Sequence, residues 1–194
     1  MPFVGLTGGL GAGKSTALAA LARLGAETLS SDAVVHELYE GDQLREAVVG
    51  RFGVEVAPGG VVDRSAVARR AFATPEDRAW LEGVVWPLVG ARVAGWLERA
   101  RARSPAPRAA VVEVPLLFEA GLQELYDATI AVVAEEPLRR ERAASRGHAL
   151  VEERAARQLS QREKAQRATF VVHNDGTEAD LERELSAVLD KLGG

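Results

Sequence analysis

The residues with the clearest chemical pattern form a glycine-rich stretch, VGLTGGLGAGKST, over positions 4–16. Four of them, Gly8, Gly13, Lys14 and Ser15, match the pattern G-x-x-x-x-G-K-[ST] without a mismatch. Glycines let a backbone curl around a polyphosphate, so that consecutive N–H groups point at the anion. A lysine at this spacing bridges the β- and γ-phosphates, and the hydroxyl after it binds Mg²⁺. The residues expected to hold the polyphosphate are Gly8, Gly11, Ala12, Gly13, Lys14, Ser15 and Thr16.

The elements on either side of this loop are those that a phosphate-binding loop needs. Residues 3–7 are typical of a buried strand, and the Ala/Leu spacing of residues 15–24 is typical of a packed helix. The helix N-terminus adds partial positive charge at the same place. The alternative is a glycine-rich turn that only joins the strand to the helix. A chance match in this composition is expected on the order of a few times in a thousand, so the sequence favours the phosphate-binding loop.

Asp32 is the first candidate for a catalytic base. A second strand is expected over residues 26–30, and ligands of parallel sheets bind beyond the carboxyl ends of the strands. Asp32 follows such an end and would face the same crevice as the phosphate-binding loop. The alternative is that Asp32 caps a helix over residues 33–39, a role that Ser30 or Ser31 could equally fill. The residues alone leave both interpretations open.

Glu113 is the candidate for a second metal-binding group. Residues 109–114 form a nearly continuous apolar run, typical of a central strand, with this one carboxylate near its end. In phosphate-loop proteins an acidic residue at that position reaches Mg²⁺ directly or through water. Residues 116–119 are expected to begin a helix that stops near Gly121. Glu119 in that helix could support the site or lie on a solvated face.

Arginines gather in the last third of the chain. A fourth strand is expected over residues 127–134, followed by a helix from Pro137 to the Arg146-Gly147 pair. Arg142 and Arg146 are four residues apart and therefore lie on one face of that helix. Taken alone, these arginines are better explained by surface ion pairs with neighbouring glutamates. Beside a polyphosphate site, a mobile arginine-bearing segment could instead close over the nucleotide and stabilise the transferring phosphoryl group.

The remaining pattern predicts a helical insertion in an α/β domain. About fifty residues of helix are expected between the second and third strands, with breaks at Thr74-Pro75 and Trp86-Pro87. All three tryptophans lie there, where core packing is the ordinary explanation and a substrate platform could use one. A fifth strand over residues 169–173 and a helix over residues 178–191 complete the chain.

Composition limits the function classes. The chain has 194 residues, 47% of them hydrophobic, which supports one substantial core with at most a small subdomain. A net charge of −4 argues against binding to nucleic acid, and the longest apolar runs are too short for a membrane span. There is no cysteine, so thiolate chemistry is excluded, and the expected metal is Mg²⁺ carried by a nucleotide. A cytoplasmic protein is expected, as a monomer or weak homo-oligomer.

Taken together, the motifs resemble the dephospho-coenzyme A kinase family over essentially the whole chain. The most specific of these motifs is PLLFE at residues 115–119, which resembles the family's D-x-P-L-L-F-E-x-x-L pattern. The arginine-rich segment also resembles the lid of that family. The matching positions are Arg142, Arg146, Arg154, Gln158 and Lys164. The matching segments are LTGGLGAGKST from Leu6, SSDAVVHEL from Ser30, VDRSAVARRAF from Val62, VEVPLLFEAGL from Val112 and HNDGT from His173.

The resemblance implies a three-layer P-loop NTPase fold with a five-stranded parallel sheet, a helical acceptor-binding insertion and a helical lid. The nucleotide-binding core would comprise residues 1–40, 108–135 and 168–194, the insertion residues 41–107 and the lid residues 136–167. The implied reaction transfers the γ-phosphoryl group of ATP to the ribose 3′-hydroxyl of dephospho-coenzyme A.

The resemblance also implies roles for individual residues. Asp32 would orient the attacking hydroxyl. Lys14, Arg142 and Arg146 would neutralise the transferring group, with Mg²⁺ bound by Ser15 and Glu113, and Asn174 would contact adenine.

Three positions depart from the family pattern. Ser30 stands where the family usually has a first aspartate, so the base role falls on Asp32 alone. Glu113 replaces an aspartate and keeps its charge. Trp86 replaces the histidine of an H-P pair, which puts in question any acceptor contact that this histidine makes.

Two other functions stay open at this point. A nucleoside monophosphate kinase would have the same architecture, with its acceptor site in the same insertion. A GTPase-like switch would be a different class of protein. It is disfavoured because guanine recognition there uses N-K-x-D, whereas the single asparagine, Asn174, is followed by Asp-Gly-Thr.

Overall fold

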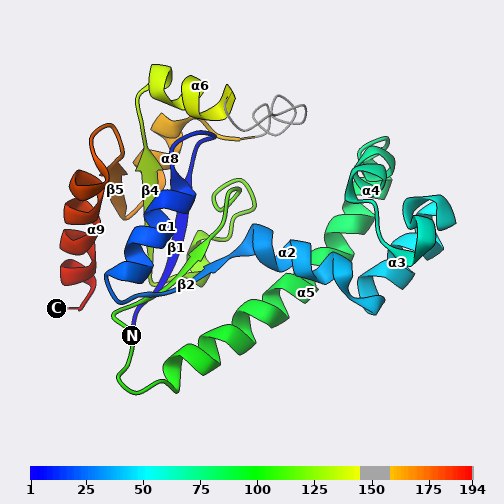
Figure 1. The fold of residues 1–194 in the computed structure, drawn as a ribbon, viewed down its shortest axis with the longest axis horizontal. Coiled ribbons are helices and arrows are strands. Elements are labelled where there is room, and N and C mark those ends of the chain that lie inside the picture. Colours follow the sequence, from blue (N-terminus) through cyan, green and yellow to red (C-terminus); the bar gives the residue numbers. More distant parts are fainter. Residues whose placement is uncertain (145–157, 194) are drawn as a thin grey trace. The chain divides into compact units, whose positions relative to one another are not determined.

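The computed structural model of the chain describes residues 1–144 and 158–193. The chain divides into two compact units, one made of Met1–Ser30 with Leu97–Gly194 and the other of Ser31–Trp96. Figure 1 shows the elements of both along the chain.

The first unit is built on a five-stranded sheet in the order β2-β3-β1-β4-β5, in which every pair of neighbours is parallel. The predicted five-stranded parallel sheet is therefore confirmed. All strands end at one edge, where β1 continues directly into the glycine-rich loop. The strands are β1 (Phe3–Gly8), β2 (Glu27–Ser30), β3 (Ala110–Glu113), β4 (Ala128–Val133) and β5 (Phe170–His173).

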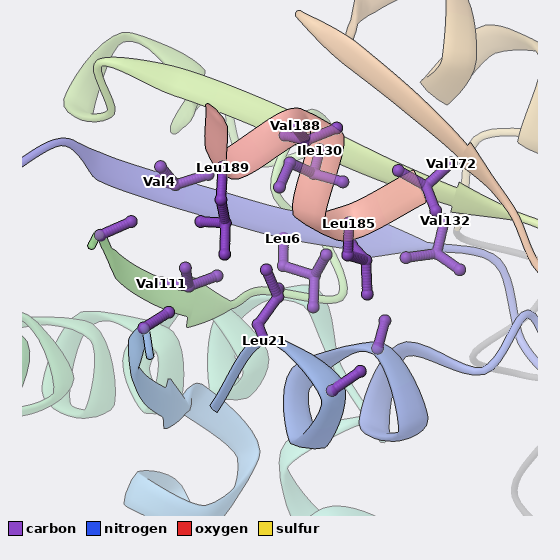
Figure 2. Packing of buried hydrophobic residues seen from close by; sticks show 14 of the residues in the cluster. Val4, Leu6, Leu21, Val111, Ile130, Val132, Val172, Leu185, Val188 and Leu189 are labelled. Atoms are coloured by element: carbon purple, nitrogen blue, oxygen red, sulfur yellow. The ribbon is translucent and has the colours of Figure 1, made fainter. Parts of the chain in front are cut away.

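Helices α1 (Lys14–Arg23) and α9 (Glu178–Gly193) pack side by side on one face of this sheet. Their apolar residues recur at helical spacing, so each helix turns one stripe toward the strands. Figure 2 shows Leu21 of α1 and Leu185 of α9 pointing toward Leu6 of β1, and all three are buried. This cluster holds the start of α1, and with it the loop, against the carboxyl end of β1.

The opposite face of the sheet is covered by α8 (Gln161–Arg167) and by the segment after β3. Gly5 of β1 lies against this segment, where a Cβ would collide with Leu117 and come within 3.0 Å of the Tyr126 ring. Because successive strand residues alternate between faces, Thr7 points to the same side as Gly5. The sheet is thus a middle layer, as the three-layer prediction requires. A short 3-10 helix (Gln123–Leu125) precedes β4, and α6 (Glu136–Ala144) follows it.

The second unit is helical and has a core of its own. The buried residues Leu44, Val48, Val56, Val67 and Val85 pack together, with Trp80 against them. Trp80 also stacks edge-on with Phe52, and Arg51 lies over its ring. The elements are α2 (Ser31–Glu40), α3 (Asp42–Phe52), two 3-10 turns (Val54–Val56 and Pro58–Gly60), α4 (Arg64–Ala71) and most of α5 (Pro75–Arg101), whose residues from Leu97 onward belong to the first unit.

The predicted helix break at Trp86-Pro87 is wrong, because α5 runs through Pro87 without interruption. A proline removes one backbone donor and crowds the preceding turn, which bends or breaks an isolated helix. Here Val84 and Val85 before the proline and Leu88 and Val89 after it all pack against one hydrophobic cluster. That packing holds the residues on both sides of Pro87 in one cluster, so the helix continues through the proline. Trp86 is 56% exposed, so it is not the core residue that was expected.

The predicted helix over residues 116–121 is also wrong. The segment makes a single helical bond, from Ala120 N–H to Leu116 O, and ends at Gly121, whose φ is 66°. Leu122 N–H then donates to Leu117 O and Gly121 N–H to Phe118 O, the arrangement that normally terminates a helix. The terminator comes so early that one turn is formed. Among the described residues, no helix is long and apolar enough to cross a membrane.

Candidate phosphotransfer site

The glycine-rich loop adopts backbone conformations that only glycine tolerates well. Gly11 and Gly13 have φ values of 73° and 91°, and α1 begins at the next residue, Lys14. A Cβ on Gly11 would collide with the carbonyl oxygen of Arg139, and one on Gly13 with the side-chain amide of Asn174. Glycine is therefore needed at Gly11 and Gly13 for two reasons: the positive φ values, and the close approach of Arg139 and Asn174.

Lys14 lies over this loop. Its Nζ donates to Gly8 O at 3.2 Å and Gly9 O at 3.3 Å, so the ammonium group is held on the inner side of the curve. Ser15 is exposed in the first turn of α1, next to the helix N-terminus. Positive charge, backbone N–H groups and a hydroxyl thus converge where the sequence pattern places polyphosphate binding.

Asn174 and Arg142 close the loop from the side of β5 and α6. The Asn174 amide donates to Ala12 O at 2.9 Å, and Asn174 itself is only 6% exposed. The Arg142 guanidinium donates to the backbone oxygen of Asn174 at 3.0 Å. The structure therefore brings Arg142, Asn174 and the loop together. Arg146, Arg154 and Arg157, which the sequence places in the same arginine-rich segment, lie outside the described residues.

Arg139, which the sequence pattern did not single out, also contacts the loop. Its Nε donates to Leu10 O at 2.9 Å in the middle of the loop, and Glu136 holds its other end at 2.8 Å. Arg139 precedes Arg142 by three residues, and side chains at that spacing share a helix face. The same periodicity that linked Arg142 to Arg146 could have found it.

Glu113 lies at the carboxyl end of β3, opposite Leu6 of β1 and Ser30 of β2. It is 7% exposed, the least accessible of the candidate polar groups apart from Asn174. Two residues before it, Val111 packs in the cluster that includes α1, and residues two apart in a strand share a face. The Glu113 side chain therefore leaves the strand on the face of the sheet that α1 covers.

Lys164 has a place that the sequence did not indicate. It is completely buried in α8, and its Nζ donates to Pro115 O at 2.6 Å and lies 3.0 Å from Glu119 Oε1. It also reaches the Thr7 hydroxyl at 3.4 Å, one residue before Gly8. Burial lowers the pKa of Lys164, and the bond to Glu119 opposes that shift. Of the two roles considered for Glu119, the structure favours support of the site.

Asp32 belongs to the second unit. Helix α2 starts at Ser31, so the capping position falls on Ser30 and Asp32 lies within the first turn, with an exposed side chain. The capping interpretation of Asp32 is therefore wrong. A carboxylate there also interacts favourably with the helix dipole.

The donor atoms fit a magnesium ion that arrives with a nucleotide. The Ser15 hydroxyl and the Glu113 carboxylate are both hard oxygen ligands of the kind Mg²⁺ prefers. Within residues 1–144 and 158–193, no group of three or more His, Cys, Asp or Glu side chains could hold a metal by itself. Phosphate oxygens and water molecules would supply the other ligands.

A parallel sheet, a glycine-rich loop leading into a helix, and a lysine held over that loop define a phosphate-loop nucleotide-binding protein. The family model described as Dephospho-CoA kinase matches residues 2–180. The chain belongs to the dephospho-CoA kinase family.

Individual relatives agree with this assignment. The Dephospho-CoA kinase of Anaeromyxobacter dehalogenans is 39% identical and aligns over 100% of this chain and 93% of its own length. A crystal structure from Thermus thermophilus is 38% identical, with a TM-score of 0.82 over 100% of this chain and 99% of the other. The Dephospho-CoA kinase structure from Campylobacter jejuni is 25% identical, with a TM-score of 0.69 over 98% of this chain and 96% of the other.

Proposed function

We propose that the chain transfers the γ-phosphoryl group of ATP to the ribose 3′-hydroxyl of dephospho-CoA, giving coenzyme A and ADP. The observation that carries the proposal is the position of Lys14, held over a complete phosphate-binding loop in a chain of this family. The geometry supports the ATP half of the reaction, and the family supports the acceptor.

Asp32 is the proposed partner of the acceptor hydroxyl. The strand before it, β2, ends at Ser30 beside Glu113, so the chain leaves the carboxyl edge of the sheet two residues before Asp32. A carboxylate can accept a hydrogen bond from the 3′-hydroxyl, orient it, and take its proton late in the reaction. Phosphoryl transfer through a loose transition state depends more on such positioning than on a strong base.

Three cations are proposed to balance the charge that develops on the transferring group. Lys14 and Arg142 lie at the loop in the structure, and Arg146 is assigned to the same role from its sequence position alone. Preorganised positive groups act most strongly where negative charge develops in the transition state. Ser15 and Glu113 would hold Mg²⁺, which would supply further positive charge to the phosphate groups. Asn174 holds Ala12 in the structure, and its proposed contact with adenine would be a second role.

The lysine provides the first experiment. Lys14→Ala should keep the fold and melting temperature but lose activity by about a thousandfold or more, because its charge acts in the transition state. Lys191→Ala, an exposed lysine on α9, is the matched control and should behave as wild type. Near-normal turnover by folded Lys14→Ala would overturn the phosphate-loop assignment.

A further inference from the structure

We propose that Arg64, oriented by His36, binds the 5′-diphosphate group of the acceptor. This inference rests on the proposed function, since it assumes that Asp32 faces the acceptor's 3′-hydroxyl. The residues that carry it, Asp32, His36, Tyr39 and Arg64, all lie within the second unit.

Arg64 contacts the helix that carries Asp32. Its Nη1 atom lies in hydrogen-bond contact with Nδ1 of His36. A guanidinium group can only donate, so Nδ1 of His36 must accept, and a neutral ring then carries its proton on Nε2. His36 thereby fixes one edge of the guanidinium fork and leaves its other donors for another anion.

The contact places Arg64 one helical turn from Asp32. Asp32 and His36 are four residues apart on α2 and are both exposed, so they share its outer face with a rise of about 6 Å between them. Tyr39 extends the same row. Its pKa is raised by burial, and the nearby charge of Arg64 opposes the shift. Arg64 therefore lies beside the part of α2 that follows Asp32.

The backbone of Arg64 is firmly placed although its side chain is exposed. The carboxylate of Asp63 caps α4, accepting from the N–H groups of Ser65 at 2.9 Å and Ala66 at 3.1 Å. Asp63 N–H in turn donates to Val56 O at 2.9 Å, in the buried core of this unit. Arg64 is the first residue of the helix so anchored, so a ligand that binds its side chain does not also have to order the backbone.

The spacing fits the acceptor's chemistry. In a nucleotide, the 3′-oxygen and the 5′-phosphorus are separated by C3′, C4′, C5′ and O5′, a span comparable to one turn of helix. If Asp32 orients the 3′-hydroxyl, the diphosphate falls beside Arg64. Arginine suits this role because its planar fork donates two parallel hydrogen bonds to phosphate oxygens.

A purely structural role is the competing explanation. Arg64 could only tie α4 to α2 through His36, whose Nε2 lies 3.8 Å from Glu40 Oε1. In that case, removing either side of the Arg64–His36 contact would have the same effect. If Arg64 binds the diphosphate, loss of the guanidinium is the larger effect, because His36 only orients it.

The test measures the affinity of the full-length protein for dephospho-CoA, adenosine and ATP by calorimetry, together with steady-state KM values. Arg64→Gln should weaken dephospho-CoA binding by at least about tenfold, or about 1.4 kcal/mol, and leave adenosine and ATP binding within about twofold. Arg69→Gln is the matched control, because Arg69 is an exposed arginine on the same helix. His36→Asn, which removes the bridging ring but keeps the guanidinium, should lose less than Arg64→Gln.

Several results would overturn the inference. Unchanged dephospho-CoA affinity in Arg64→Gln would do so, as would an equal loss for adenosine, or a loss in His36→Asn as large as in Arg64→Gln. If Arg64→Gln has a lowered melting temperature, Arg64→Lys replaces it in the same comparison. Arg64→Lys should lose less affinity than Arg64→Gln, and only for dephospho-CoA. The proposed function fails separately, if the wild-type protein does not phosphorylate dephospho-CoA at all.

Discussion

The ammonium group of Lys164 lies 3.0 Å from the carboxylate of Glu119, and the lysine is completely buried. This pair joins α8 to the segment after β3, and the same lysine reaches Pro115 and Thr7 at the carboxyl ends of β3 and β1. Lys164 therefore links the carboxyl ends of β1 and β3 at the edge of the sheet that carries the phosphate-binding loop.

Removing one member of the Lys164–Glu119 pair should lower the free energy of unfolding more than removing both charges. Lys164→Met leaves the Glu119 charge buried without its partner, so we expect a loss of about 3–5 kcal/mol in the free energy of unfolding. Lys164→Met combined with Glu119→Gln removes both charges and should recover at least about 1 kcal/mol of that loss. Chemical denaturation of both single variants and the double variant measures this. Additive losses would show that the two side chains do not interact.

Asn174 should matter for stability and for ATP binding together. Asn174→Ala leaves the buried carbonyl of Ala12 without its side-chain donor, which should destabilise the fold by about 1–2 kcal/mol. The loop that Asn174 holds should loosen, so the KM for ATP should rise several-fold while the KM for the acceptor changes little. His173→Gln, at the exposed neighbouring position, serves as the control. An unchanged KM for ATP would show that the contact is not needed for nucleotide binding.

Arg142 and Arg140 offer a matched pair on α6. Arg142 contacts the backbone of Asn174 beside the loop, whereas the Arg140 side chain is 79% exposed and pairs with Glu136. Arg142→Ala should reduce kcat by about a hundredfold or more, because a cation at the transferring group acts in the transition state. Arg140→Ala should change kcat less than twofold, since exposed ion pairs contribute little. Equal kcat values for the two variants would show that Arg142 has no role in phosphoryl transfer.

Asp32→Asn should lower kcat much more than it raises either KM, because the carboxylate is proposed to act on the reacting hydroxyl alone. Its effect on melting temperature should be small, since a carboxylate in the first turn of a helix contributes at most about 1 kcal/mol. Glu37→Gln changes an exposed carboxylate on the same helix and is the control. A large loss of stability with full activity per folded molecule would contradict the catalytic role.

The parts of the fold that follow local rules could be predicted from the sequence. The central strands follow from apolar runs and the loop from glycines at fixed spacing, and Gly11 and Gly13 have positive φ values that suit glycine. Pro87 could not be predicted as a helix interior, because the packing of Val85 and Leu88 outweighs its local preference.

The site was harder to predict where long-range contacts decide a residue's role. In the sequence, Lys164 is one of several basic residues in a charged segment, and its burial depends on Glu119 and Pro115, more than forty residues away. Arg139 differs from Arg140 by the helix face it occupies, and its spacing of three residues from Arg142 indicates that face.

The choice of acceptor tests the account most directly, because the phosphate-loop chemistry is shared by many kinases. The measurement is the ATP- and Mg²⁺-dependent release of ADP with dephospho-CoA, AMP, CMP or UMP as acceptor, with the product identified by mass. We predict phosphorylation of dephospho-CoA on its 3′-hydroxyl, and a kcat/KM at least about a hundredfold lower for each nucleoside monophosphate, since these lack the pantetheine arm and its binding energy. Faster turnover of any nucleoside monophosphate than of dephospho-CoA would contradict the account.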